Sequence, residues 1–243
     1  MKTYGIIGYP LEHSFSQRYF TSKFDQDGLD CEYKVFPIRE ITQLGSIISD
    51  NADLKGLNVT IPHKQSVIEL LDDVSNLPKD LNACNCIKIK EGKLIGYNTD
   101  VFGFEKSLIP LLKNHHQHAL ILGHGGAAQA VKFVLDKLKI PYSIVGRHLY
   151  KDTAMTYGDL TKDIIQQHKL IINTTPLGTF PDVNSFPNIP YKYLTKDHLL
   201  YDLVYNPEKT EFLKKGDERG AAIKNGYEML VLQAEEGWKI WNA

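Results

Sequence analysis

A lysine just past the end of a strand-like segment is the first residue of this chain whose position suggests chemistry. In residues 57–61, apolar side chains alternate with Asn58 and Thr60, which is typical of a β-strand. Pro62 cannot donate to a sheet ladder, so the strand should end there and leave Lys64 in the turn that follows. Open α/β sheets bind ligands beyond their strand ends, and the hydroxyl, amide and ammonium groups here suit an anionic, oxygen-rich small molecule. An isolated lysine at such a point is usually only solvated, so its role depends on its partners.

Asp100 is the residue best suited to pair with Lys64. It ends the segment 96–100, which precedes a helix-like stretch, so its carboxylate is either a helix cap or a partner for the ammonium group. If the two side chains meet in a crevice, Asp100 keeps Lys64 charged and oriented, and both can contact adjacent substrate hydroxyls. The residues alone leave both alternatives open.

Two serines, Ser14 and Ser16, stand at the expected start of the first helix. A serine at such a place most often caps the helix. Two serines spaced by two, together with free backbone N–H groups, can also hold a carboxylate. Capping is therefore the alternative against which carboxylate binding must be tested.

A glycine turn indicates a nucleotide site in the second half of the chain. Residues 119–128 form the pattern of a strand, a turn and a helix start, with Gly123, Gly125 and Gly126 in the turn. Such glycines let the backbone approach a pyrophosphate, and the helix N-terminus adds free N–H groups and a positive dipole end. A strand precedes the turn, a helix follows it, and a second strand comes about 20 residues on, so the context favours dinucleotide binding over tight packing alone.

The end of that second strand indicates which cofactor is bound. Arg147 stands there between Gly146 and His148, with Lys151 close behind and no carboxylate before Asp152. An acidic residue would bind the ribose 2′-hydroxyl of NAD, whereas an arginine suits the 2′-phosphate of NADP. The sequence therefore predicts NADP. The alternative is that Arg147 is only a solvated loop residue.

Strand-like and helix-like segments alternate along the chain, which predicts largely parallel sheets in two α/β domains, with a boundary near residues 99–118. The expected strands cover residues 3–9, 31–38, 57–61, 86–90, 93–97, 119–122, 141–145, 170–173 and 199–204. The expected helices cover residues 16–27, 40–49, 65–74, 101–112, 127–138, 160–167 and 228–241. The strands 86–90 and 93–97 flank Glu91-Gly92 and should form a hairpin.

Composition excludes several classes of function. The chain has 243 residues with 28 basic and 29 acidic side chains, and a net charge of −1 argues against nucleic acid or an anionic membrane as a main partner. No apolar run approaches the roughly 18 residues of a membrane span, and no signal peptide is visible. We therefore expect a cytoplasmic protein.

The cysteines and histidines give no metal site. Cys31, Cys84 and Cys86 are an odd number without a second pair at zinc-site spacing, so we expect neither a disulfide framework nor bound zinc. His115, His116 and His118 should lie in a solvated loop, and the alternative for them is an adventitious metal site.

Ordered motifs along the whole chain resemble the shikimate dehydrogenase family. The family's G-x-P-x-x-H-S-x-S and N-V-T-x-P-x-K motifs are matched by Gly8, Pro10, His13, Ser14 and Ser16 and by Asn58, Val59, Thr60, Pro62 and Lys64. Asn85 matches a later asparagine of the family, and residues 96–100 match its G-x-N-T-D motif. Residues 123–128 match G-x-G-G-A-A, and residues 173–178 match N-T-T-P-x-G. Asp202, Tyr205 and Pro207 match D-x-x-Y-x-P. The last helix fits with Gly226, Met229, Leu230 and Gln233. The chain departs from the family at His124, at Asn82 and around Arg147, where Gly146 and His148 replace the usual neighbours.

The resemblance implies a role for each matched residue. Lys64 and Asp100 would be the catalytic pair. The substrate would be bound through its carboxylate by Ser14 and Ser16 and through its ring hydroxyls by Asn58, Thr60, Asn85, Asp100 and Gln233, with Tyr205 as a further contact. The cofactor would be bound by Gly123, Gly125, Gly126, Ala127, Arg147 and Thr174, with Gly226 and Met229 lining the nicotinamide site.

The resemblance also implies the architecture and the activity. Residues 1–100 would form the substrate domain, residues 101–222 a Rossmann-like NADP domain, and residues 223–243 a helix that returns to the first domain, with the active site in the cleft between domains. The activity would be the reversible, NADPH-dependent reduction of 3-dehydroshikimate to shikimate in aromatic amino acid (chorismate) biosynthesis, without a metal. The alternatives are an NAD-dependent quinate/shikimate dehydrogenase, against which Ser16 argues, and a non-catalytic ligand-sensing relative, against which Lys64 and Asp100 argue. Oligomeric state stays open between monomer and homodimer.

Overall fold

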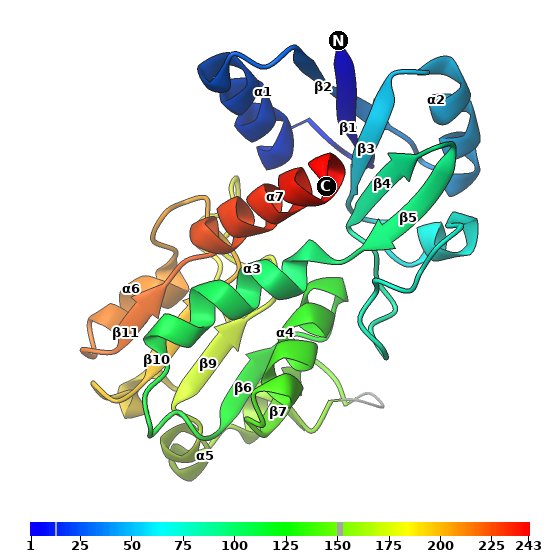
Figure 1. Ribbon diagram of the computed structural model, residues 1–243. Coiled ribbons are helices and arrows are strands. Elements are labelled where there is room, and N and C mark those ends of the chain that lie inside the picture. Colours follow the sequence, from blue (N-terminus) through cyan, green and yellow to red (C-terminus); the bar gives the residue numbers. More distant parts are fainter. Residues whose placement is uncertain (13, 150–152) are drawn as a thin grey trace. The chain divides into compact units, whose positions relative to one another are not determined.

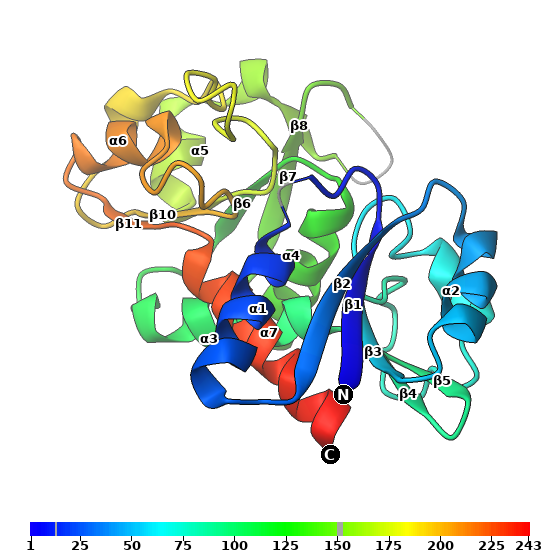
Figure 2. The ribbon, with the colours of Figure 1, turned by 90° about the horizontal axis from the view of Figure 1, so that it is seen from above.

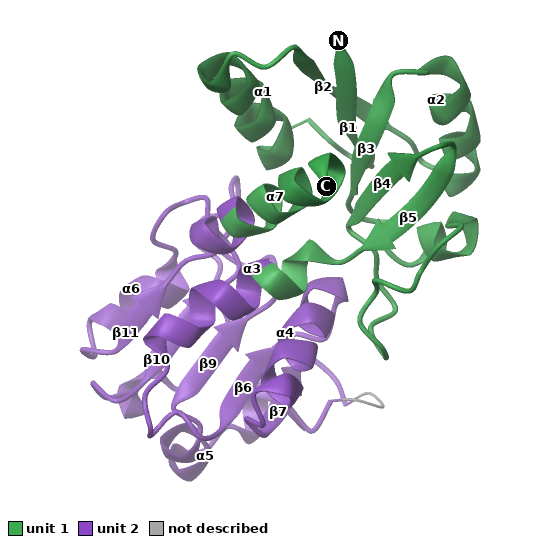
Figure 3. Cartoon of the chain, in the orientation of Figure 1, with its two compact units in different colours: residues 1–102, 232–243 green, residues 103–231 purple. Residues whose placement is uncertain are grey.

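The computed structural model describes residues 1–12, 14–149 and 153–243. The chain consists of two compact units (Figures 1 and 3). Unit 1 contains residues 1–102 and 232–243, and unit 2 contains residues 103–231. Each unit is built on its own β-sheet, as expected for a two-domain α/β protein.

Unit 1 has a five-stranded sheet in the order β2-β1-β3-β4-β5. The strands are β1 (Lys2–Gly8), β2 (Cys31–Pro37), β3 (Leu54–Val59), β4 (Cys86–Lys90) and β5 (Lys93–Tyr97). The first three in space are parallel, and β4 and β5 form the expected antiparallel hairpin on one side. The helices are α1 (Phe15–Asp27), α2 (Leu44–Asp50) and the 3₁₀ segments η1 (Ile41–Gln43) and η2 (Ser66–Leu70).

The two faces of this sheet carry different cores. On one face lie α1 and the last helix, α7 (Tyr227–Asn242) (Figure 2). The aromatic rings of both helices pack against Tyr4. On the other face, α2 packs Leu44 against Leu57 and its neighbours. The side chains of β3 alternate between these faces, so Asn58 projects toward the side covered by α1 and α7 while Leu57 and Val59 project toward α2.

The C-terminal end of α7 is built into the core of unit 1. The indole of Trp241 lies on Gly56 of β3, where a Cβ atom would come within 2.3 Å of the ring, so only glycine fits. The indole Nε1 donates to the carbonyl of Ile87 at 3.0 Å. This packing fixes α7 to the N-terminal sheet, as the family resemblance implied.

Unit 2 has a six-stranded, all-parallel sheet in the order β11-β10-β9-β6-β7-β8. The strands are β6 (Ala119–Leu122), β7 (Tyr142–Gly146), β8 (Met155–Thr156), β9 (Leu170–Asn173), β10 (Leu199–Asp202) and β11 (Ala222–Lys224). The helices are α3 (Thr99–Leu108), whose residues up to 102 belong to unit 1, α4 (Gly126–Lys137), α5 (Lys162–Gln167), α6 (Glu211–Asp217) and the 3₁₀ segments η3 (Ile109–Leu111), η4 (Tyr157–Asp159) and η5 (Tyr191–Tyr193).

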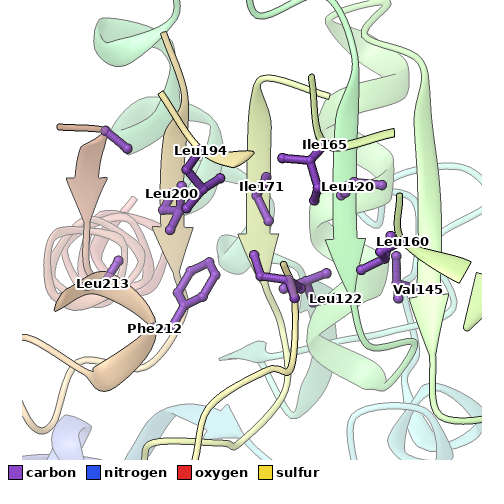
Figure 4. Packing of buried hydrophobic residues seen from close by; sticks show 12 residues of the cluster. Leu120, Leu122, Val145, Leu160, Ile165, Ile171, Leu194, Leu200, Phe212 and Leu213 are labelled. Atoms are coloured by element: carbon purple, nitrogen blue, oxygen red, sulfur yellow. The ribbon is translucent and has the colours of Figure 1, made fainter. Parts of the chain in front are cut away.

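Parallel strands are buried on both faces, which is why the central strands β6, β9 and β10 are fully buried and consist mainly of apolar residues. On one face, Leu120, Ile171 and Leu200 pack against α5 and α6 (Figure 4). On the other face, the ring of Phe104 in α3 lies edge-on to Tyr201, with centroids 5.1 Å apart.

Residues 65–74 differ from the prediction. A helix was expected, but only Ser66–Leu70 form a short 3₁₀ segment. The chain then becomes extended, and the backbone N–H groups of Asp72 and Asp73 donate to the carbonyl of Leu94 at 2.9 and 3.2 Å. Pairing with the exposed edge of β5 therefore replaces the helical hydrogen bonds that the apolar periodicity predicted. No helix among the described residues is both long and apolar enough to cross a bilayer.

His116 also differs from the prediction, because its side chain is buried rather than solvated. Its Nδ1 accepts a hydrogen bond from the backbone N–H of Lys113 at 3.0 Å. Burial lowers the pKa of His116 from 6.5 to about 4, and nearby His115 adds to this effect. Burial likewise lowers the pKa values of His168 and His198.

From the lowered pKa values of these buried histidines, we predict that the stability of unit 2 decreases at acid pH. Because the folded-state pKa of His116 lies below the unfolded value, its stabilising contribution is present above pH 6.5 and is lost as the pH falls toward 4. We expect Tm to fall across this range, and His116→Asn, which keeps an acceptor for Lys113, to reduce the fall. Thermal denaturation against pH checks this, with His148→Asn at an exposed position of the same unit as the control. An equal pH dependence in wild type and His116→Asn would contradict the assignment.

Candidate active site

Lys64 and Asp100 form an ion pair in unit 1. Lys64 Nζ lies 2.6 Å from Asp100 Oδ2, and the two side chains keep 27% and 18% of their surface exposed. The Lys64 backbone is fixed by a hydrogen bond from the N–H of Cys84 to its carbonyl at 2.7 Å. The ammonium group is therefore held in place by the carboxylate and is still accessible to a ligand, which suits a proton donor or a stabiliser of negative charge.

Asp100 is not the cap of α3. That role belongs to Asn98, whose Oδ1 accepts from the N–H of Val101 at 3.2 Å while its Nδ2 donates to the carbonyl of Ala83 at 2.8 Å. The capping alternative for Asp100 is thus wrong, because the neighbouring asparagine satisfies the helix end and leaves the Asp100 carboxylate to Lys64.

Thr99 connects two of the expected substrate residues. Its N–H donates to Asn85 Oδ1 at 2.6 Å, and its hydroxyl accepts from Asn85 Nδ2 at 3.0 Å. The same hydroxyl lies 3.3 Å from Gln233 Oε1 on α7, and all three side chains are buried. The structure thus brings Gln233 to the β4–β5 hairpin although the two are far apart in sequence. Thr99 belongs to a matched family motif, but the sequence analysis predicted no role for it in substrate binding.

Ser14 and Ser16 occupy different positions at the start of α1. Ser14 is the N-cap, and its Oγ accepts from the N–H of Gln17 at 3.3 Å, so the capping alternative is confirmed for Ser14. Ser16 lies within the first turn of α1 and is buried. His13, which belongs to the same motif, lies outside the described residues. The ends of β1 and β3 meet in this part of unit 1, because a Cβ on Gly8 would come within 2.4 Å of the Thr60 side chain.

The turn between β6 and α4 has the geometry of a dinucleotide turn. Gly123 has a φ of +99°, and a Cβ there would lie 3.0 Å from the hydroxyl of Thr174 and 2.9 Å from Thr175. The Thr174 hydroxyl donates to the carbonyl of Leu122 at 2.8 Å, which holds the end of β9 against β6. A glycine is therefore required at this position by both conformation and space.

The next two glycines face open space. Gly125 is the N-cap of α4 and Gly126 its first residue, and no protein atom lies within 4 Å of a Cβ placed on either. Gly125, Gly126 and Ala127 are exposed, so the free N–H groups of a 12-residue helix point to an uncovered surface. These residues fit a pyrophosphate, since a group can approach the backbone without meeting a side chain.

Arg147 follows β7 directly and is exposed. Gly146 before it is tightly enclosed, because a Cβ there would lie 3.0 Å from Thr153 and 3.1 Å from the carbonyl of His148. Because Gly146 is so tightly packed, the backbone position from which the Arg147 side chain projects is fixed. Lys151 and Asp152 lie outside the described residues.

The remaining expected residues lie in unit 2 after β10. The buried Asp202 carboxylate accepts from the Thr210 hydroxyl at 2.6 Å, from Asn173 Nδ2 at 2.9 Å and from the Val204 N–H at 3.0 Å, and burial raises its pKa to about 6. These bonds tie the turn after β9 to the segment that carries the half-buried Tyr205.

Packing requires a glycine at position 226, because a Cβ there would come within 2.1 Å of the carbonyl oxygen of Leu203. Met229, in the first turn of α7, is buried. Among the described side chains, no group of three or more His, Cys, Asp and Glu residues is placed to hold a metal ion.

The parallel six-stranded sheet and the glycine turn before α4 define the class, an α/β protein with a dinucleotide-binding unit of the Rossmann type. A family model described as the shikimate dehydrogenase substrate binding domain matches residues 6–87. A shikimate dehydrogenase (NADP(+)) of Methanococcus maripaludis strain C7 is 37% identical, and the match covers 99% of this chain and 91% of the relative. The chain therefore belongs to the shikimate dehydrogenase family, as its motifs predicted.

Solved structures agree with this family. The crystal structure of a shikimate dehydrogenase in complex with NADP+ matches with a TM-score of 0.84 and 32% identity, over 99% of this chain and 90% of that chain. The shikimate 5-dehydrogenase of Thermus thermophilus, in complex with NADP(H) and shikimate, matches with a TM-score of 0.85 and 25% identity, over 99% and 93% of the two chains. The expected two-domain α/β fold is confirmed.

Proposed function

We propose that this protein reduces 3-dehydroshikimate to shikimate reversibly with NADPH. The observation that carries the proposal is the Lys64–Asp100 pair, with 2.6 Å between Nζ and Oδ2, at the end of the family's substrate motif. Its membership of the family, whose relatives are named shikimate dehydrogenase (NADP(+)), supports the same reaction. The reaction would serve aromatic amino acid biosynthesis.

Lys64 acts on the oxygen of the reacting ketone. NADPH, when bound, supplies the hydride. The Lys64 ammonium stabilises the negative charge that develops on the carbonyl oxygen and donates its proton to that oxygen. Asp100 keeps the ammonium charged and directed, and in the reverse reaction the neutral amine takes the proton back.

The substrate is held by polar side chains of unit 1. Ser16 binds the carboxylate together with the N–H groups of α1 and with Ser14, whose Oγ accepts from Gln17 as a cap and can still donate its own proton. The ring hydroxyls are bound by Asn58, Thr60, Asn85, Asp100 and Gln233, and we also assign Tyr205 to substrate binding, as the resemblance implies. We assign substrate binding to residues 1–100 and to the helix within 223–243.

The cofactor is held by residues 101–222 together with the start of α7. The Gly123–Ala127 turn and Thr174 bind the pyrophosphate side, Arg147 binds the 2′-phosphate, and Gly226 and Met229 line the nicotinamide site. Arg147 is the residue that selects NADP over NAD, because a guanidinium meets a phosphate with paired, charge-assisted hydrogen bonds.

A panel of four reactions tests the proposal. Purified protein is mixed with shikimate or quinate and with NADP or NAD, and nicotinamide absorbance is followed. We expect shikimate with NADP to be the fastest. Preference for quinate with NAD would favour the quinate/shikimate alternative, and no turnover in any mixture would favour a ligand-sensing protein.

Ser14 and Ser16 should respond differently to substitution by alanine. A contact to the carboxylate, away from the reacting carbon, serves ground state and transition state alike, so Ser16→Ala should raise the KM for shikimate about ten- to a hundredfold with little change in kcat. Ser14→Ala should also lower Tm, because the cap of α1 is worth about 1 kcal/mol. Shikimate KM and Tm measured on both variants separate the roles. A Ser16→Ala variant with unchanged KM would remove Ser16 from the carboxylate site.

We also propose that the protein acts in the cytoplasm. All three cysteines are free thiols, which is the usual state in a reducing compartment.

A further inference from the structure

Tyr33 links two of the residues proposed to bind substrate. It lies in β2, its ring stacks on Phe20 of α1 with centroids 5.0 Å apart, and it is buried. Its hydroxyl donates to Asn58 Oδ1 at 2.6 Å. A hydrogen bond with Ser16 involves the same hydroxyl and opposes the rise that burial causes in the pKa of Tyr33. Because β1 lies between β2 and β3, the tyrosine reaches across one strand to join Asn58 to the start of α1.

The hydrogens in this chain of contacts can be counted. A phenol has one proton, and here it goes to Asn58 Oδ1, so the other half of the Asn58 amide, the Nδ2 donor, faces away from Tyr33. Gly237 of α7 lies next to Nδ2, because a Cβ built there would already be 4.0 Å away, and the glycine leaves room beside this donor that a larger side chain would fill. The Oδ1 acceptor of Asn58 is therefore used by Tyr33, and the Nδ2 group is the part of the amide that can donate to a ligand.

The same count applies to Ser16. Since the Tyr33 proton is committed to Asn58, the phenol offers Ser16 only lone pairs. Ser16 can therefore meet the phenol only as a donor. A serine has one proton, so this contact gives Ser16 no additional donor for the substrate, and the effect of Tyr33 on substrate binding runs through Asn58.

We propose that Tyr33 is a positioning residue that sets Asn58 as a hydrogen-bond donor toward the substrate. The inference rests on the proposed function for its ligand, shikimate. Tyr33 itself does not touch the substrate, and it acts only by orienting the amide of Asn58.

Tyr33→Phe tests this, because it keeps the ring and removes the hydroxyl. We expect the Kd and KM for shikimate to rise about 3- to 10-fold, while kcat and the KM for NADP change by less than about twofold. The matched control is Tyr4→Phe. Tyr4 is also buried in unit 1, and its hydroxyl donates to an amide oxygen, Asn242 Oδ1, at 3.3 Å, away from the proposed substrate residues. The control should alter Tm without altering the Kd for shikimate.

Two further variants sharpen the test. Combining Tyr33→Phe with Asn58→Asp should weaken shikimate binding by less than the product of the single effects, because Tyr33 acts through Asn58. Asn58→Asp keeps the acceptor that Tyr33 uses, replaces the Nδ2 donor by an acceptor oxygen and adds a negative charge, so it should weaken binding of the anionic shikimate more than Tyr33→Phe does. This variant tests whether position 58 must donate even if Tyr33→Phe does not fold.

Calorimetric Kd values for shikimate keep the result independent of turnover. An unchanged Kd in Tyr33→Phe or in Asn58→Asp, or an equal rise in Tyr4→Phe, overturns the inference. A wild type that binds shikimate without oxidising it overturns the proposed function but leaves the comparison of variants valid. A wild type that does not bind shikimate overturns both.

Discussion

Lys64→Ala should lower kcat for shikimate oxidation by about 10²–10⁴-fold, with a much smaller change in KM. The reason is that the ammonium group acts mainly on charge at the reacting oxygen, and this charge is greatest in the transition state. Steady-state kinetics with shikimate and NADP measure both constants. Near-normal turnover would remove Lys64 from the mechanism.

The control for this prediction is another ion-paired lysine of the same unit. Lys23 lies 3.2 Å from Asp27 and 3.1 Å from Glu235, and its side chain is 19% exposed. Lys23→Ala removes a similar ion pair and should leave kcat unchanged.

Asp100→Asn should also lower kcat, since the ammonium loses its counter-charge and its orientation. The double variant Lys64→Ala/Asp100→Asn should lose much less than the product of the two single effects, because the residues act as one unit. Independent, multiplicative effects would mean that the ion pair is not the catalytic unit.

Arg147→Asp should weaken NADP(H) about 10²–10³-fold while sparing NAD(H). The substitution removes charge-assisted hydrogen bonds to the 2′-phosphate and places a repelling carboxylate in their stead. Calorimetric Kd values for NADP and NAD measure the effect. The same loss for both cofactors would show that Arg147 does not read the 2′-phosphate.

Arg219→Asp is the matched control for the change of charge. Arg219 is an exposed arginine of the same unit, just after α6, so the substitution changes the net charge equally. It should leave both Kd values near those of the wild type.

The strand end before Lys64 could be predicted because its signals are local. Alternation in 57–61 and the proline at 62 indicate a strand end before Lys64, and β3 does end at Val59. The glycine turn was equally visible, since conformation and space require a glycine at 123. Strand ends and turns of this kind can be predicted from a single sequence because they depend on residues that are adjacent in it.

Contacts between distant residues could not be predicted in the same way. Tyr33 looks like any aromatic residue of a strand until the sheet order places it two strands away from Asn58, within reach across β1. Capping of α3 by Asn98 was missed because three adjacent polar residues, 98–100, all suit a helix start. The strands β8 and β11 have only two and three residues, too few for any periodicity.

The most direct test of the account is a stoichiometric one. NADPH-loaded protein is mixed with 3-dehydroshikimate, and the loss of NADPH absorbance is compared with the shikimate formed, identified by chromatography. The account predicts one shikimate for each NADPH oxidised, and almost none over the same time with Lys64→Ala. Binding of 3-dehydroshikimate without loss of NADPH, or equal rates in the two proteins, would contradict it.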